Sequence, residues 1–312
     1  MHSSFKTGLL SLAILMTTGE VAFGQERDNV NPRTNRNAAG LPPGSRVFKD
    51  VVYEHVGDRE LPLDIYLPAD AEGLLPLVIW VHGGGWQGGS KNGANRFSGL
   101  LDRGYAVASV QYRLSGEAIF PAAVEDCKAA VSFLRLNAEK YGLDPDRFGA
   151  WGSSAGGHLV AMLGVTGDSD IFDTHPVTKL APSTVQAVCN WFGPSDLLRM
   201  NDFPGRMDHD AADSPESRFI GAPIQEHPEL TQRANPIAYV TAADAPFLHM
   251  HGDKDGLVPY NQSELLHAAL QQAKISTELY QVKNGDHGFR GADESAEVLF
   301  ERVVQFFDRE LK

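Results

Sequence analysis

The chain has 312 residues, of which 42% are hydrophobic and 21% charged, with 31 Gly and 18 Pro. This composition predicts one large or two small globular domains with a sizeable core and argues against wholesale disorder. Asp and Glu outnumber Lys and Arg by 40 to 27, a formal net charge of −13, and no basic cluster interrupts this balance, so we expect neither nucleic acid nor an anionic membrane surface as a partner.

The N-terminus has the pattern of a secretory signal. Lys6 precedes an apolar run from Gly8 to Met16, and Ala22-Phe23-Gly24 offers a small-x-small cleavage pattern. The run is too short to span a bilayer, and the alternative is an ordinary N-terminal helix. We therefore expect a signal peptide over residues 1–24, a flexible leader over residues 25–45, and a secreted or periplasmic protein without a membrane span.

Residues 46–312 have the pattern of one α/β domain. Two alternating runs from Arg46 to Pro68 predict an antiparallel strand pair. Apolar strands then alternate with helices, which is typical of a mostly parallel sheet covered on both faces. Strands are expected at 75–82, 105–113, 147–151, 185–191, 246–251 and 277–282, and helices at 92–103, after Pro121, from about 154, at 260–273 and at 295–311. About 50 residues rich in Pro, Asp, Ser and Asn interrupt this alternation and predict a cap insertion over about 193–245.

The two cysteines are expected to be free. Cys127 falls on the apolar face of a predicted helix and Cys189 lies within a predicted strand. Although an exported protein can form disulfides, these positions favour two buried thiols over a bridge.

The sequence GSSAG, residues 152–156, has the Gly-x-Ser-x-Gly pattern with Ser154 at its centre. Such a string is weak by itself, because small residues also begin ordinary helices. Here an apolar strand precedes it and the helix HLVAMLGV follows, which favours a sharp turn that exposes a nucleophilic serine. Ser153 would be the nucleophile only if it, and not Ser154, were the central serine of the motif. The N–H of Ala155 is expected to face the substrate carbonyl.

A serine nucleophile needs a base, and the base needs a carboxylate that orients its ring. His287 lies in the loop GDHGF after the last predicted strand, and Asp253 and Asp255 follow the strand before it. Both loops leave carboxyl ends of strands, where open α/β sheets bind ligands. His287 is therefore the candidate base, with a surface loop residue as the alternative, and either aspartate could be the acid. The other histidines considered are poorer candidates because of their positions in strands, in a helix or too early in the chain: His82, His158, His249 and His251.

The motif HGGGW, residues 82–86, follows a predicted buried strand and precedes a helix. Consecutive glycines let backbone amides turn toward one point, as an oxyanion hole requires. His82 is expected to brace this loop by hydrogen bonding. Three aromatic residues near the predicted strand ends could wall an apolar substrate pocket, with core packing as the alternative: Trp86, Trp191 and Phe192.

From Arg46 to the C-terminus the chain resembles the α/β-hydrolase serine esterases, because HGGGW, GSSAG, HGDKDGLVP and GDHGF occur in the family's order. It is most similar to secreted feruloyl and acetylxylan esterases of the bacteroidete type, and more distantly to hormone-sensitive-lipase-like carboxylesterases. The resemblance implies an α/β-hydrolase fold without a cofactor. It implies a triad of Ser154, Asp255 and His287, and oxyanion donors at Gly84, Gly85 and Ala155.

Two positions depart from the family pattern. Gly256 stands where members often have proline after the acid, and Asp286 places a carboxylate beside the candidate base. The first leaves the rigidity of the acid loop open, and the second makes Asp286 a possible modulator of His287. Asp208-His209-Asp210 in the predicted cap could in principle bind a metal ion, but adjacent residues seldom face one ion, so a solvated loop without metal is expected.

The expected function is that of a secreted serine carboxylesterase. The resemblance favours short or aromatic acyl esters of plant polysaccharide as substrates, with small-molecule esters also possible. Three alternatives share the same machinery or scaffold: an arylformamidase-like amide hydrolase, a prolyl-oligopeptidase-like peptidase, and a noncatalytic ligand-binding homologue. The sequence leaves the oligomeric state open.

Overall fold

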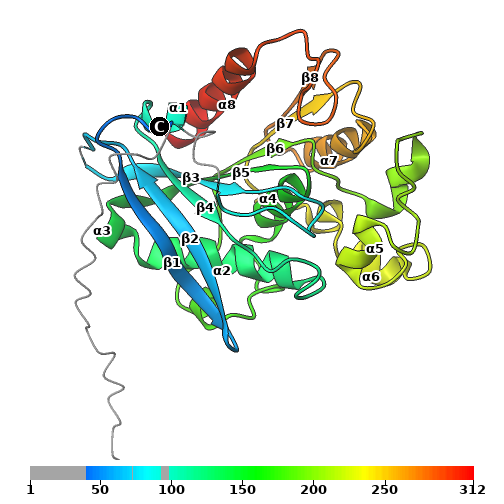
Figure 1. Cartoon of the computed structure of the whole chain (residues 1–312), viewed down its shortest axis with the longest axis horizontal. Helices are drawn as coiled ribbons and strands as arrows, with labels where there is room; N and C mark the ends of the chain where they lie inside the picture. Colours follow the sequence, from blue (N-terminus) through cyan, green and yellow to red (C-terminus); the bar gives the residue numbers. More distant parts are fainter. Residues whose placement is uncertain (1–39, 72, 93–97) are drawn as a thin grey trace, which may run out of the picture. The chain divides into compact units, whose positions relative to one another are not determined.

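A computed structural model describes residues 40–312 except 72 and 93–97 (Figure 1). The predicted signal peptide and residues 25–39 of the predicted leader lie outside the described residues, and both remain predictions. Within the described part of the chain, no helix combines the length and the apolar character that crossing a bilayer requires.

The described residues form one sheet of eight strands: β1 (Arg46–Val56), β2 (Arg59–Leu67), β3 (Leu75–Val81), β4 (Ala106–Val110), β5 (Leu143–Ser153), β6 (Ala187–Trp191), β7 (Phe247–Gly252) and β8 (Thr277–Val282). Their order across the sheet is β1-β2-β4-β3-β5-β6-β7-β8. β1, β2 and β4 pair antiparallel, and every later neighbour is parallel. The expected α/β-hydrolase fold class and the antiparallel entry pair are confirmed.

The described helices are α1 (Ser98–Leu101), α2 (Ala122–Leu136), α3 (Ala138–Tyr141), α4 (Ala155–Thr166), α5 (Pro215–Ile220), α6 (Pro228–Gln232), α7 (Asn261–Gln272) and α8 (Ala296–Leu311). Short 3₁₀ helices add Pro176–Lys179, Leu197–Asp202 and Pro236–Tyr239. One apolar core contains residues of α2, α4 and α7, and a second contains residues of α1 and α8. Figure 1 shows α8 on the other side of the sheet from α2 and α4. Helices therefore cover both faces, as the apolar strands predicted.

The central elements explain why these residues adopt this fold. Every residue of β3 is buried, because β4 and β5 flank it and helices cover both faces. Every residue of α4 is buried as well, so this helix has no solvent-exposed face. Gly164 brings α4 close to the sheet, because a Cβ there would lie 2.5 Å from the ring of Phe247. The carboxyl end of β5 and the start of α4 are thus fixed in the core.

Most predicted boundaries agree with the structure to within two residues, with three exceptions. β4 ends at Val110, three residues before the predicted end at 113. β5 begins at Leu143, four residues before the predicted Arg147, because Leu143 already pairs with Leu75 of β3. The helix predicted over 92–103 is described only as α1, since residues 93–97 lie outside the described residues.

The insertion between β6 and β7 contains α5, α6 and two 3₁₀ helices. Phe219, Ile220 and Ile224 from this insertion are buried in the core that contains α2 and α4. Ser214 caps α5 by accepting a hydrogen bond from the backbone N–H of Ser217. The predicted cap segment is therefore partly helical and packs into the domain, while its predicted boundaries remain predictions.

Both cysteines are free and buried, which confirms the prediction. Cys127 belongs to the core that contains α2 and α4, and Cys189 belongs to the core that contains α1 and α8. Burial raises the pKa of both thiols well above the ordinary value. These thiols therefore serve packing.

Candidate active site

Ser154 lies on the turn between β5 and α4 with a φ of 56°, a value that side-chain-bearing residues seldom adopt. Its backbone N–H donates to the carbonyl of Trp191 at 2.9 Å, and its carbonyl accepts from the N–H of His158 at 3.1 Å. The turn is therefore held by β6 on one side and by the first turn of α4 on the other. This is the geometry that the Gly-x-Ser-x-Gly pattern predicted.

The two flanking glycines are required by close backbone contacts. A Cβ at Gly152 would lie 2.2 Å from the carbonyl oxygen of Gly156, and a Cβ at Gly156 would lie 2.1 Å from the carbonyl oxygen of Val81. Both distances are far shorter than a carbon–oxygen contact allows. The motif thus lets β3, β5 and α4 meet at the base of Ser154.

His287 joins the candidate nucleophile to the candidate acid. Its Nε2 lies 3.1 Å from Ser154 Oγ, and its Nδ1 lies 2.8 Å from Asp255 Oδ2. Because an ionised carboxylate only accepts hydrogen bonds, Nδ1 donates to Asp255 and Nε2 is free to accept from the serine hydroxyl. Neither alternative residue, Ser153 or Asp253, makes a hydrogen bond to His287 among the described contacts. The structure therefore brings together Ser154, Asp255 and His287.

Asp255 is fixed by more than the base. Its Oδ1 accepts the backbone N–H groups of Leu257 and Val258, both at 2.9 Å. Burial raises the pKa of this carboxyl, but hydrogen bonds from His251 and His287 outweigh burial and hold the pKa well below the ordinary value. Asp255 therefore stays ionised at neutral pH, as an orienting acid must.

His251 is a site residue that the sequence did not identify as one. It is fully buried on β7, and its Nε2 lies 2.9 Å from the Val258 carbonyl and 3.3 Å from Asp255 Oδ2. Its Nδ1 lies 2.8 Å from Ser263 Oγ, which can donate to it. His251 thus contacts the same carboxylate oxygen that His287 Nδ1 contacts. The sequence gives one indication of this role: His251 lies near the end of a predicted strand, four residues before Asp255.

Asp286 connects three loops and does not hydrogen-bond the ring of His287. Its Oδ1 accepts the N–H of His287 at 2.8 Å and that of Gly256 at 3.4 Å, while Oδ2 accepts from Arg206 Nη2 at 2.8 Å. The hydrogen bond from Arg206 lowers the pKa of this carboxyl. A proline at position 256 has no N–H and could not make this hydrogen bond. The two departures from the family pattern, Gly256 and Asp286, therefore occur together as donor and acceptor.

The glycine loop packs directly on the nucleophile turn. A Cβ at Gly83 would lie 2.6 Å from the Ser153 carbonyl oxygen, so only glycine fits. His82 braces the loop as expected: its Nδ1 lies 2.8 Å from the Gly83 carbonyl, and its ring stacks on Tyr112 at 4.3 Å. Gly84 accepts hydrogen bonds from the two residues that close the turn, Gln87 and Gly88. Its role as an oxyanion donor remains a prediction.

A cavity of about 80 Å³ lies beside Ser154. Gly85 and Ala155, two of the three predicted oxyanion donors, line it together with Ser154 and Trp86. Residues of the insertion, among them Pro194 and Met207, also line it. Two predicted oxyanion donors, Gly85 and Ala155, and the nucleophile Ser154 thus surround one small cavity.

Trp86 lines this cavity but is also a core residue. It is 2% exposed, stacks on Phe219 at 4.5 Å, and donates from Nε1 to His158 Nδ1 at 3.3 Å. Burial lowers the pKa of His158 to about 4, so that ring is neutral and its Nδ1 can accept. Trp86 is therefore both a cavity wall and a core aromatic, the two alternatives that the sequence left open.

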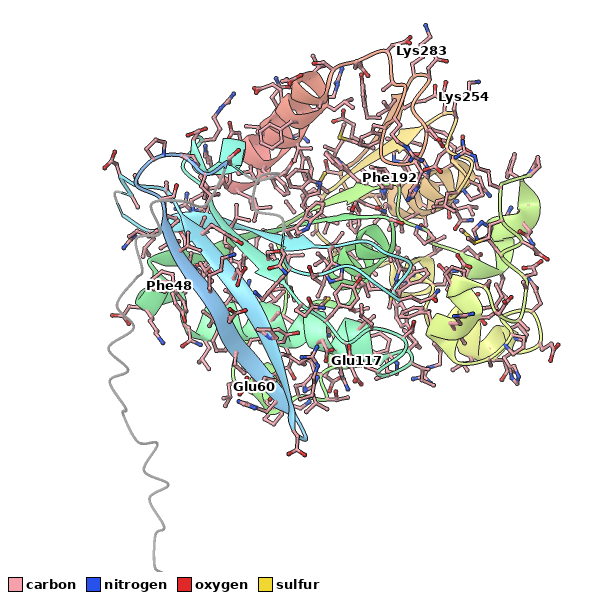
Figure 2. All side chains as sticks on the ribbon, viewed as in Figure 1. Phe48, Glu60, Glu117, Phe192, Lys254 and Lys283 are labelled. Carbon is pink, nitrogen blue, oxygen red and sulfur yellow. The ribbon has the colours of Figure 1, made fainter. Side chains whose placement is uncertain are left out.

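Trp191 and Phe192 do not line the small cavity beside Ser154, but both line a separate cavity of about 780 Å³ together with Ser153 and Gly288. Their role as a substrate wall therefore remains a prediction. Phe192, labelled in Figure 2, packs edge-on against the ring of His287 at 4.7 Å, and Trp191 packs against Trp151 and Phe289. Because β6 ends beside the nucleophile turn, Trp191 at its end and Phe192 directly after it face the loop of the base. These two aromatics support His287.

Asp208, His209 and Asp210 point to different partners. Asp208 accepts from Asn201, Asp210 accepts from Gln225, and His209 turns inward toward Glu216. In the part of the chain that the structure describes, no group of three His, Cys, Asp or Glu side chains could hold a metal ion.

Comparisons with known proteins agree with this geometry. The model of the BD-FAE family matches residues 63–270. "Esterase LipQ" of Mycobacterium tuberculosis is 32% identical over 242 residues, which cover 75% of this chain and 55% of that protein. A solved "truncated form of carbohydrate esterase from gut microbiota" is 31% identical with a TM-score of 0.76, covering 88% of this chain and 98% of that one.

A second solved structure, "Bifunctional GH43-CE" of Bacteroides eggerthii, is 33% identical with a TM-score of 0.77 and matches 85% of this chain but 35% of that one. The chain spans about half the length of the curated relatives that it matches first.

Proposed function

Because the chain belongs to the BD-FAE family, a family with the α/β-hydrolase fold, we propose that it is a serine-dependent carboxylic-ester hydrolase. The observation that carries this proposal is His287, which lies within hydrogen-bond distance of both Ser154 Oγ and Asp255 Oδ2. A serine, a base and an ionised orienting acid in this arrangement are the requirements of acyl transfer through a serine.

In the proposed mechanism Ser154 Oγ attacks the ester carbonyl carbon while His287 Nε2 takes the hydroxyl proton. The negative oxygen of the tetrahedral intermediate is stabilised by backbone N–H groups of the cavity wall, those of Gly85 and Ala155. Asp255 stabilises the resulting imidazolium. His287 then protonates the leaving alcohol as the carbon–oxygen bond breaks, and a water activated by the same histidine hydrolyses the acyl-enzyme.

The cavity supports a short acyl group. About 80 Å³ is roughly half the volume of an engineered cavity of about 150 Å³ that admits a benzene ring. An acetyl group therefore suits this space better than a feruloyl group. One similar solved structure is that of a carbohydrate esterase from gut microbiota, which supports a carbohydrate as the alcohol. We propose short-chain esters of carbohydrates as substrates, acted on after export.

An acyl-length series tests this substrate assignment. We expect kcat/KM to fall at least about 10-fold from p-nitrophenyl butyrate to the octanoate, and feruloyl esters to react at least about 100-fold more slowly than acetates. Acetylated xylan, N-formylkynurenine and a peptide anilide complete the panel. Faster turnover of feruloyl esters than of acetates would contradict the short-acyl assignment, and preferred turnover of the formamide or the anilide would contradict ester hydrolysis.

His251 should act as a positioning residue for Asp255. His251→Phe keeps a buried ring but removes both nitrogens, whereas His251→Gln retains a side-chain donor. We expect kcat to fall about 10-fold or more in the Phe variant and less in the Gln variant, with KM changed little, because a misplaced acid misaligns the base. Steady-state kinetics of both variants would show this order, and equal kcat values in wild type and the Phe variant would refute the role.

A further inference from the structure

Trp86 has a strained backbone conformation directly after the two glycines predicted as oxyanion donors. Gly84, Gly85 and Trp86 have φ values of 116°, 59° and 57°, so three successive residues have the positive φ that favours glycine. Glycine adopts such values readily, but a bulky residue is strained there and keeps the conformation only where its surroundings enforce it. Contacts of Trp86 must therefore hold this end of the glycine loop.

The contacts that hold Trp86 come from three distant parts of the chain. In the insertion, Phe219 stacks on the indole of Trp86, with ring centroids 4.5 Å apart and planes 11° apart. On α4, His158 Nδ1 lies 3.3 Å from Trp86 Nε1, and the His158 ring packs edge-on against both aromatic rings. After β4, the backbone N–H of Ser115 donates to the Trp86 carbonyl at 2.8 Å. Both the side chain and the backbone of Trp86 are thus fixed.

His158 can accept from Trp86 because its other nitrogen carries the ring proton. His158 Nε2 lies 2.7 Å from the carbonyl oxygen of Ala234, in the insertion. A carbonyl only accepts, so Nε2 donates to it and Nδ1 accepts from Trp86 Nε1. The ring is fully buried, and burial lowers its pKa to about 4, so it is neutral at neutral pH. His158 thus connects the helix after the nucleophile to the insertion and to Trp86.

The glycines before Trp86 have backbone N–H groups that are available to a substrate. Among the described contacts, neither the Gly84 N–H nor the Gly85 N–H donates to another atom. Gly85 lines the cavity beside Ser154, and the insertion packs on it, since a Cβ at Gly85 would lie 3.4 Å from Pro215 Cβ. An amide stabilises an oxyanion best when its direction is fixed before the reaction. Because glycine is the most flexible residue, anchoring the adjacent Trp86 limits the directions that the Gly85 N–H can take.

We propose that Trp86 is a positioning residue for the oxyanion hole, held in place by His158 and by Phe219 of the insertion. The inference rests on the proposed ester hydrolysis and deepens it by naming the residues that orient the Gly85 amide. Releasing Trp86 weakens the binding of the transition state more than that of the substrate, because the full negative charge on the carbonyl oxygen develops only during the reaction. The insertion thereby contributes to catalysis.

Variants behind Trp86 test the proposal, because neither His158 nor Phe219 is among the described residues that line the cavity beside Ser154. His158→Leu removes the acceptor, whereas His158→Asn keeps an acceptor near the position of Nδ1. In His158→Leu and Phe219→Leu we expect kcat for p-nitrophenyl acetate to fall about 10-fold or more, with KM within about 3-fold of wild type. His158→Asn should recover most of the lost kcat.

Inhibition by trifluoroacetone supplies a readout that a merely structural role would not change. Ser154 Oγ adds to its carbonyl carbon as His287 takes the proton, and the hemiketal oxygen occupies the place of the oxyanion. Partial unfolding lowers the apparent kcat because fewer molecules are active, but it leaves the inhibition constant Ki of the folded molecules unchanged. We expect Ki to rise in His158→Leu and Phe219→Leu by about the factor that kcat falls.

Phe172 provides the matched control for Phe219. Both residues are 1% exposed, and both pack edge-on against Phe120, with ring centroids 5.7 and 5.6 Å apart. Among the described ring contacts, only Phe219 of the two packs on Trp86. Phe172→Leu should therefore lose a similar amount of stability but keep kcat and Ki within about 3-fold of wild type.

Two results would overturn the proposal while leaving the proposed function intact: an unchanged Ki in either His158→Leu or Phe219→Leu, and an equal rise of Ki in Phe172→Leu. Wild-type protein that neither hydrolyses p-nitrophenyl acetate nor binds trifluoroacetone would instead overturn the proposed function, and this inference with it.

Discussion

Replacing Ser154 by alanine is expected to lower kcat for p-nitrophenyl acetate by about 10⁴- to 10⁶-fold. The variant loses the oxygen that forms the acyl-enzyme, so His287 and Asp255 have no nucleophile to activate. The side chain loses one atom, which should leave the melting temperature within about 2 °C of wild type. End-point assays of p-nitrophenol release with purified protein measure kcat, and thermal melts followed by circular dichroism measure the melting temperature.

The neighbouring serine is the matched control. Ser153 ends β5 and makes no described hydrogen bond to His287, so Ser153→Ala should retain kcat within about 3-fold. Loss of activity in Ser153→Ala with activity kept in Ser154→Ala would show that the motif frame is wrong.

Replacing Gly156 by alanine should have the largest effect on stability. A Cβ there would lie 2.1 Å from the Val81 carbonyl oxygen and 2.6 Å from that of His82. Both atoms belong to backbone that β3 and its loop fix, so neither can move away cheaply. We expect the free energy of unfolding to fall by about 4 kcal/mol or more and the melting temperature by about 10 °C. Thermal and urea melts measure both.

Helix propensity makes the opposite prediction for this substitution. Gly156 lies in the first turn of α4, where alanine would be favoured by about 1 kcal/mol if nothing else were near. Gly116→Ala is the matched control, because a Cβ there meets no atom within 4 Å. It should change stability by less than about 1 kcal/mol. If Gly156→Ala melts within 2 °C of wild type, the close contact with β3 is not as described.

The parts of the fold that could be predicted from the sequence are those with a local signal. Continuous apolar strands separated by helices predicted the mostly parallel sheet, and the glycine motif predicted the turn at Ser154. The chain order of serine, acid and base predicted which residues lie close together, because loops after parallel strands leave the same edge of the sheet. Asp253 and Asp255 remained alternatives, and the structure places Asp255 against His287.

The features that could not be predicted depend on side-chain direction and on long-range packing. His209 belongs to a polar stretch without periodicity, so nothing in its sequence shows that it turns inward to Glu216 while both neighbours face other partners. His251 is a strand residue, and its contact with Asp255 could not be predicted because that contact depends on the path of the loop after β7. Phe192 was expected at a pocket wall and does line a cavity of about 780 Å³, but its edge-on contact with the ring of His287 depends on long-range packing and could not be predicted.

The central claim is that Ser154 is a nucleophile activated by His287 and Asp255, and covalent labelling tests it most directly. Wild-type protein treated with a fluorophosphonate probe should gain the mass of one adduct, which peptide mapping should assign to Ser154, and Ser154→Ala should gain none. Folded wild-type protein that takes up no adduct, or an adduct that maps to another residue, would contradict the account.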